Sequence, residues 1–296
     1  MPLFMVISGF FAGTVFKYSI KEALLTKACQ LLIPVLVWGT ILYGIETLII
    51  GKDIGTYQDA LISRYFWFLK SLFGCFFLFI IGANLIGNRY IGLLIALAIS
   101  QLFIIYKIRY MFPCFIFGYV LNQNLLFVQK NIRTIVIVSI LIFIMMLPGW
   151  GVDKMFPSLS KEQLISNPIY SLGFLYYKLI IGLAGSMICI GVCLILCKDK
   201  KREGVIATIS EWGTYTLSIY ILQSVLLETI LASLINIDVT NDWRLNFICF
   251  PLISFFLLWT CISIHKFMIR KPLTGFMLQP SWKSIKKILQ TKTSET

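Results

Sequence analysis

The sequence predicts an all-α fold, a polytopic bundle of membrane-spanning helices. Hydrophobic residues make up 58% of the 296 residues and charged residues only 13%, whereas a soluble domain usually carries about 25% charge. Apolar stretches of roughly 20 residues, each able to cross a ~30 Å hydrocarbon core, recur along the whole chain. Because backbone groups in lipid have to hydrogen-bond to one another, such stretches form helices.

About nine apolar windows follow one another, with no soluble domain or low-complexity linker between them. We expect each window to form one transmembrane helix. The windows cover residues 3–16, 31–50, 66–87, 90–106, 111–128, 134–148, 176–197, 214–235 and 245–269. The chain is therefore predicted to consist of a transmembrane domain over residues 1–269 and a basic tail over residues 270–296.

The Lys and Arg residues between the windows predict the orientation. One alternate set of loops is rich in them and contains Lys17, Lys21, Lys27, Arg89, Lys130, Arg133, Lys198, Lys200, Lys201, Arg202 and the tail from Lys266 onward. The other set contains only Lys52, Arg64, Lys107, Arg109, Lys154, Lys161 and Arg244. The richer set should be cytoplasmic, which predicts a multi-pass protein of the cell membrane with its C-terminus inside and Met1 outside.

The first window is short for a membrane span. Residues 3–16 would form a helix of about 21 Å, less than the core thickness, and an outside N-terminus without a leader is difficult to insert. We therefore expect that one more helix originally preceded Met1.

The net charge of +13 does not indicate nucleic-acid binding, because the basic residues lie in loops and follow the positive-inside rule. The eight cysteines lie in or beside apolar windows and form no Cys-x-x-Cys pair. Neither structural disulfides nor a bound metal is expected.

Five segments form an ordered set of motifs along the chain. The first is Met1-Pro-Leu-Phe-Met-Val-Ile-Ser-Gly-Phe10. The others are Lys27-Ala-Cys-Gln-Leu-Leu-Ile-Pro34 followed by Trp38, Tyr65-Phe-Trp-Phe-Leu-Lys-Ser-Leu-Phe73, Phe112-Pro-Cys-Phe-Ile-Phe-Gly-Tyr119 and Trp212-Gly-Thr-Tyr-Thr-Leu-Ser-Ile-Tyr-Ile-Leu-Gln223. Together they resemble the motifs of the acyltransferase family 3, the membrane O-acetylase type, whose second-helix signature is a His-Met-Pro-Leu-Phe run leading into Ser-Gly-Phe or Ser-Gly-Tyr. The resemblance covers nearly the whole chain.

The resemblance implies about ten helices and transfer of an acyl group, usually acetyl, from cytoplasmic acyl-CoA. The implied acceptor is a hydroxyl of a cell-envelope glycan or lipid-linked saccharide. The family's essential His would lie upstream of Met1, so we expect little acyl transfer from this chain expressed alone. Lys27 and Gln30 stand where the family has two arginines, and Gln223 stands where many members have His.

Charged residues inside apolar windows are costly and are functional candidates by default. Lys70 and Glu228 fit this description best, with Glu46 closer to a window's edge. A carboxylate could act as the base that acyl transfer requires, so Glu228 and Lys70 are the candidate catalytic residues. The structural alternative is an ion pair or a side chain that reaches the interface. The sole histidine, His265, is interpreted as an interfacial residue beside the basic tail.

The predicted substrate-binding residues come from the motifs. Ser8 and Gly9 allow either close helix packing or contact with a substrate path. Tyr220 and Gln223 are three apart and share a helix face, where they could bind substrate or another helix. With Trp67, and with Lys27 and Gln30 facing the phosphates of coenzyme A, the set is Ser8, Gly9, Lys27, Gln30, Trp67, Tyr220 and Gln223.

Three functions agree with these features. The first is a membrane O-acyltransferase that uses acyl-CoA and modifies an envelope saccharide. The second is a carrier that moves a saccharide or lipid-linked glycan without chemistry. The third is a non-catalytic remnant that lacks the helix bearing the essential His.

Overall fold

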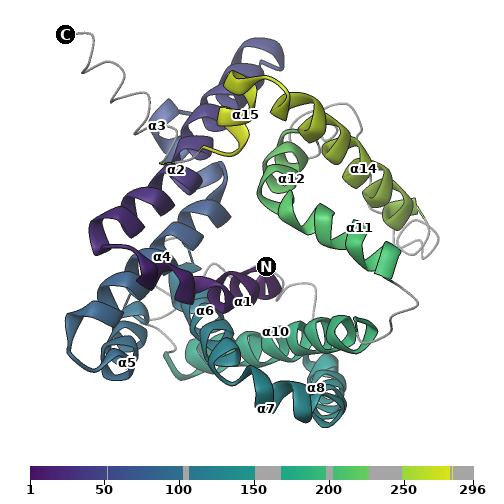
Figure 1. Cartoon of the computed structure of the whole chain (residues 1–296). Coiled ribbons are helices and arrows are strands. Elements are labelled where there is room, and N and C mark those ends of the chain that lie inside the picture. The colour runs from purple at the N-terminus through teal and green to yellow at the C-terminus, as the bar shows by residue number, and fades with distance from the viewer. Residues whose placement is uncertain are drawn as a thin grey trace. The chain divides into compact units, whose positions relative to one another are not determined.

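The computed structural model describes residues 1–51, 53–102, 107–150, 168–197, 203–226, 249–280 and 282. Over these residues the chain is helical and contains no strand, which confirms the all-α prediction (Figure 1). Five helical stretches are long and apolar enough to cross a membrane: Ile20–Ile49, Trp67–Leu85, Ile132–Gly149, Leu172–Leu196 and Phe250–Ile269. Each of the five overlaps one predicted window.

The remaining predicted windows correspond to shorter helices. Window 3–16 forms α1 (Pro2–Phe10) and a 3₁₀ turn, η1 (Ala12–Lys17). Window 90–106 forms α5 (Arg89–Ser100), and window 214–235 begins with α12 (Thr216–Gln223). Window 111–128 is broken at Asn124 into α6 (Ile108–Gln123) and α7 (Leu125–Lys130). Hydropathy did not predict this break, because apolar residues continue on both sides of it.

Some boundaries also differ from the prediction. α2 (Ile20–Gly44) begins well before residue 31, and it continues into a π-helical turn, η2 (Ile45–Ile49). The added turns contain Lys21, Glu22 and Lys27, which form helices readily although they are too polar for an apolar window. α10 (Pro168–Leu196) likewise begins before residue 176, with Pro168 at its first position, where the missing N–H does no harm.

The chain divides into two compact units. Unit 1 comprises Met1–Ile20 and Gly74–Glu203, and unit 2 comprises Lys21–Phe73 and Gly204–Thr296. α4 (Trp67–Leu85) contributes its first turns to unit 2 and the rest to unit 1.

Unit 1 is built on the close contact between α1 and α6 (Figure 1). A Cβ atom on Gly9 would collide with the backbone oxygen of Phe115, and a Cβ on Gly118 would collide with the backbone oxygen of Val6. The Asn122 amide also donates a hydrogen bond to the carbonyl of Phe10. The Ser8-Gly9 pair thus permits close helix packing, one of its two sequence interpretations.

Contacts at one end of unit 1 agree with the predicted alternation of the windows. The Tyr110 hydroxyl at the start of α6 donates to the carbonyl of Lys178, which lies ten residues into α10 and near the start of the predicted window 176–197, at 3.2 Å. The Tyr177 hydroxyl donates to the Met146 carbonyl at the end of α8 (Ile132–Met146), which continues as the short turn η5 (Leu147–Gly149). These ends were all predicted to lie on the outer side. The contacts join the ends, while the choice of cytoplasmic side still depends on the Lys and Arg distribution.

Unit 2 contains α2, the short α3 (Tyr57–Asp59), the π-turn η3 (Ala60–Arg64), α11 (Glu203–Thr214) apart from its first residue, α12, α14 (Phe250–Ile269) and α15 (Pro272–Leu278). α15 begins the predicted basic tail and packs on α14 and α12. The Trp38 indole donates a hydrogen bond of 3.2 Å to the Met277 carbonyl, and Leu278 is fully buried. The packed part of unit 2 therefore extends past residue 269.

Substituting Gly9 or Gly118 by Ala should destabilise the protein by about 1–3 kcal/mol, because the new methyl group meets backbone rather than a movable side chain. The measurement is the free energy of unfolding in detergent micelles. Gly173→Ala is the matched control, since a Cβ at Gly173 on α10 meets nothing within 4 Å. An equal loss for all three variants would contradict the packing described for α1 and α6.

Candidate functional site

A group of polar residues joined by buried and half-buried hydrogen bonds lies in unit 2, where η2, η3 and the start of α4 come together. Glu46 is within η2, Arg64 ends η3, Tyr65 follows it, and Lys70 is on the first turn of α4. Both segments around Glu46 and Arg64 are π-helical, a geometry that is uncommon and often found at functional sites. We call Glu46, Arg64, Tyr65 and Lys70 the unit 2 polar cluster.

Glu46 is the buried charge of this cluster, with 2% of its surface exposed. The Tyr65 hydroxyl donates a hydrogen bond to Glu46 Oε2, and Arg64 Nη2 donates to Oε1 at 3.3 Å. A buried carboxylate is stable only when it is paired and hydrogen-bonded, and here both oxygens have a donor. Burial, together with the hydrogen bond that Tyr65 gives to Glu46, raises the pKa of the Tyr65 hydroxyl, which keeps it in the donating form.

Lys70 holds the segment that precedes α4. Its Nζ donates hydrogen bonds of 2.7 Å to the carbonyls of Leu61 and Ile62 in η3. The last carbonyls of a helical turn have no partner within the turn, and a lysine ammonium can satisfy them. These bonds give Lys70 a structural role, although they go to backbone carbonyls and are neither the ion pair nor the interface-reaching side chain of the structural alternative. Its catalytic role stays a prediction.

The aromatic residues that follow Tyr65 contact Tyr220, a predicted binding residue on α12. Phe66 has a φ of +49°, a left-handed conformation that costs a non-glycine residue roughly 1–2 kcal/mol, and it is 4% exposed. Its ring lies 6.2 Å from that of Tyr220, and the Phe68 ring lies 5.4 Å from Tyr220. Half-buried Trp67 stacks edge-on with Phe68. The structure therefore brings Trp67, Lys70 and Tyr220 into one neighbourhood.

Lys27 and Gln30 lie at the other end of α2 from Glu46. Lys27 Nζ donates to Gln30 Oε1 at 3.4 Å, one turn along the same helix. At 1.5 Å per residue, Lys27 and Glu46 are separated by roughly 28 Å along the helix, close to the thickness of the hydrocarbon core. The predicted binding pair on α2 and Glu46 in η2 are thus about one membrane thickness apart along the helix.

The other predicted site residues do not join this neighbourhood. Gly9 packs on α6 in unit 1, and Ser8 beside it is half-buried. Gln223 is exposed at the end of α12. Glu228 lies outside the described residues.

The His265 side chain is buried within unit 2, with 1% of its surface exposed, so it packs among helices, while its position at the membrane interface stays a prediction. Its ring lies 4.4 Å from that of Tyr215, which precedes α12. Among the described residues, neither imidazole nitrogen nor the buried Ser218 hydroxyl has a hydrogen-bond partner. The neighbouring Lys266 instead pairs with Glu211 at 3.0 Å, and the hydrogen bonds from Lys266 and Tyr215 lower the pKa of that carboxyl.

Sequence reasoning assigned Arg64 to an outer loop and did not pair it with Glu46. A signal was present, since a Glu inside an apolar window requires a partner and Arg64 is among the nearest cations along the chain. No signal predicted the left-handed conformation of Phe66, because φ depends on the packing around the ring.

Comparison with protein families identifies the scaffold. The profile described as an acyltransferase domain, that of acyltransferase family 3, matches residues 1–266. The chain belongs to this family. The match contains all five motifs from which the resemblance was inferred, and it places a multi-pass helical membrane protein among acyltransferases.

Two curated relatives are nodulation proteins. The chain is 31% identical over 137 residues to nodulation protein NolL of Sinorhizobium fredii, covering 42% of this chain and 37% of the relative. It is 27% identical over 175 residues to nodulation protein NolL of Mesorhizobium japonicum, covering 51% of this chain and 44% of the relative. The aligned segments thus span less than half the length of either relative. No solved structure matches the chain.

Tyr65→Phe should destabilise the protein by about 1.5–3 kcal/mol, because it removes a hydrogen bond to a buried charge. Arg64→Gln should cost less than about 1 kcal/mol, since 51% of the Arg64 side chain is exposed and water screens the pair. Tyr57→Phe is the control, because Tyr57 is exposed and shares its hydrogen bond with Thr40. Unfolding in micelles gives the three free energies, and the reverse order for Tyr65 and Arg64 would contradict the geometry.

Proposed function

We propose that this chain acts in transferring an acyl group, most simply acetyl, from acyl-CoA to a hydroxyl of a cell-envelope saccharide. The observation that carries the proposal is the match to the acyltransferase family over residues 1–266. In the reaction, the acceptor oxygen bonds to the acyl carbon, the thioester C–S bond breaks, and coenzyme A leaves as a thiol. The hydroxyl proton passes to a base, for which Glu228 is the candidate in this chain, while Lys70 is the candidate for binding an anionic group.

The arrangement of α2 supports a donor and an acceptor that arrive from opposite faces. Lys27, on the predicted cytoplasmic side, would attract the phosphates of coenzyme A. About 28 Å away along the helix, the unit 2 polar cluster and the aromatic rings around Tyr220 offer hydrogen-bonding and stacking groups of the kind that bind sugars. In the orientation that the Lys and Arg distribution predicts, the protein lies in the cytoplasmic membrane with its C-terminus inside.

Deletion of the coding sequence in the cell that makes this protein should remove ester-linked acyl groups from one envelope saccharide. Mass spectrometry of the purified saccharide before and after mild base treatment measures those groups, and reintroducing the gene should restore them. Unchanged esters combined with reduced saccharide export would contradict the proposal and favour the carrier function.

Lys27→Gln should raise the KM for acetyl-CoA by about tenfold with little change in kcat, because a contact to a remote phosphate binds substrate and transition state alike. Radiolabelled acetyl-CoA and membranes of the cell that makes this protein, with the substitution made in its chromosomal gene, provide the assay. Lys21→Gln is the matched control, since Lys21 is exposed at the start of the same helix. Equal effects of the two substitutions would show that only the overall surface charge matters.

A further inference from the structure

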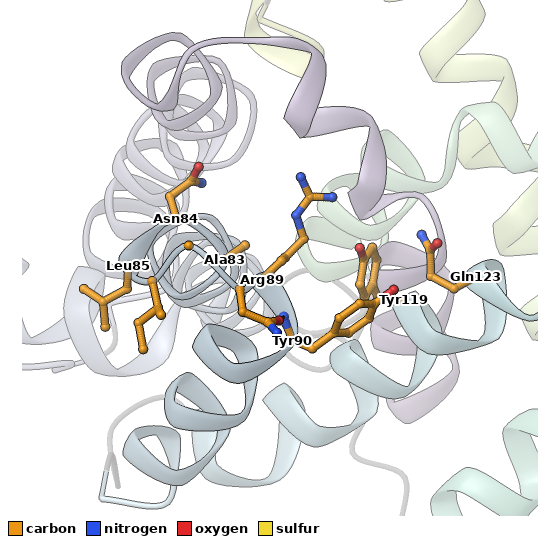
Figure 2. A pocket seen from close by; sticks show the side chains of 10 residues that line it. Ala83, Asn84, Leu85, Arg89, Tyr90, Tyr119 and Gln123 are labelled. Atoms are coloured by element: carbon orange, nitrogen blue, oxygen red, sulfur yellow. The ribbon is translucent and has the colours of Figure 1, made fainter.

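A pocket of about 810 Å³ opens in unit 1, at the turn between α4 and α5. Its walls come from the end of α4, the turn 86–88, the start of α5 and the last turns of α6. Figure 2 shows the Arg89 side chain standing between Asn84 on one side and Tyr119 and Gln123 on the other. All the lining residues belong to unit 1.

No carboxylate pairs with Arg89 among the residues of unit 1 that the structure describes. The sequence contains no Asp or Glu over residues 1–20, 74–150 or 168–197, which make up the described part of unit 1 apart from Glu203. Among the residues that the structure describes, the guanidinium stacks on a ring and forms no ion pair: its carbon lies 3.9 Å from the centroid of Phe16. A cation held in a pocket without a carboxylate favours an anionic ligand.

The ring beneath Arg89 is itself held in place. Phe16 contacts the rings of Phe79 and Tyr119, with centroids 5.3 Å and 6.3 Å away. Because the Phe16 ring lies against the guanidinium carbon, N–H groups at the guanidinium edge remain available for the fork geometry that matches a phosphate. The side chain is therefore oriented before any ligand arrives.

The other polar groups of the pocket suit an anion as well. Gln123 presents its amide at the edge, and the Asn84 amide nitrogen, which donates one hydrogen bond of 2.7 Å to the Ile80 carbonyl, has a second N–H. Asn88 caps α5 by accepting a hydrogen bond of 3.0 Å from the Tyr90 backbone N–H. α5 runs for 12 residues from Arg89, so the positive end of its dipole faces the same space.

We infer that the pocket formed by Asn84, Arg89, Tyr119 and Gln123 binds a phosphate group of a ligand on the predicted cytoplasmic side. The group could belong to a soluble nucleotide or to the headgroup of an anionic phospholipid, and both present the same oxygens to the guanidinium. The inference goes beyond the proposed function, since phosphate binding here does not depend on acyl transfer.

Binding to the full chain tests the inference, with one probe for each source. Adenosine 3′,5′-bisphosphate, titrated calorimetrically against protein in phosphatidylcholine nanodiscs, represents a nucleotide. Phosphatidylglycerol retention, measured by native mass spectrometry from mixed nanodiscs, represents a lipid. Arg89→Gln is compared with Arg133→Gln, which removes the same charge at the exposed start of α8 and on the same predicted side, but does not line the pocket.

Arg89→Gln should weaken the affinity for one of the two probes by about tenfold or more, the loss expected for a charged hydrogen bond. Arg133→Gln should leave that affinity unchanged. A loss confined to the nucleotide identifies a soluble ligand, and a loss confined to phosphatidylglycerol identifies a lipid. The inference is overturned if neither probe binds the unchanged protein, or if the two variants bind alike. Should Arg89→Gln fail to fold, Gln123→Leu at the exposed rim takes its place. We expect Gln123→Leu to weaken binding of the same probe by a smaller factor, and unchanged binding would contradict the site.

Discussion

Between helices in lipid there is no hydrophobic driving force, so their association depends on how closely the backbones approach. In unit 1 this approach is set by Gly9 on α1 and Gly118 on α6, each of which faces a backbone oxygen of the other helix. The rest of the unit follows from that contact. The continuation of α1 brings Phe16 beneath Arg89, and the continuation of α6 brings Tyr119 and Gln123 to the same pocket. Gly9 of the Ser8-Gly9 pair thus helps to position the residues that line the pocket, because it allows α1 and α6 to pack closely.

In unit 2 the organising constraint is electrostatic. A carboxylate such as Glu46 is tolerated in an apolar environment only when donors surround it, and the π-turns η2 and η3 bring Arg64 and Tyr65 to it. Lys70 then bonds the carbonyls of η3. These contacts fix the segment that presents Phe66 and Phe68 to Tyr220. Polar residues of the kind a membrane acyltransferase requires are therefore also the residues that hold this part of the fold together.

Composition and window length were sufficient to predict an all-α membrane protein, because lipid allows few alternatives. Five of the windows became helices of spanning length, and the packing interpretation of Ser8-Gly9 was correct for Gly9. The break at Asn124, the pairing of Glu46 with Arg64 and the burial of His265 could not be predicted in the same way. The break at Asn124 accompanies a local hydrogen bond from its side chain to the Val120 carbonyl. The other two depend on contacts between separate segments, such as Tyr215 against His265, and hydropathy carries no information about either kind of contact.

The sidedness of the reaction tests the central claim most directly. Membrane vesicles of both orientations from cells that make this protein are supplied with labelled acetyl-CoA on the outside only, and labelled saccharide is then counted. If the chain acts as a membrane acyltransferase whose basic face is cytoplasmic, inside-out vesicles should label the saccharide, while right-side-out vesicles and vesicles from a deletion strain should not. Equal labelling with and without the protein would contradict the account.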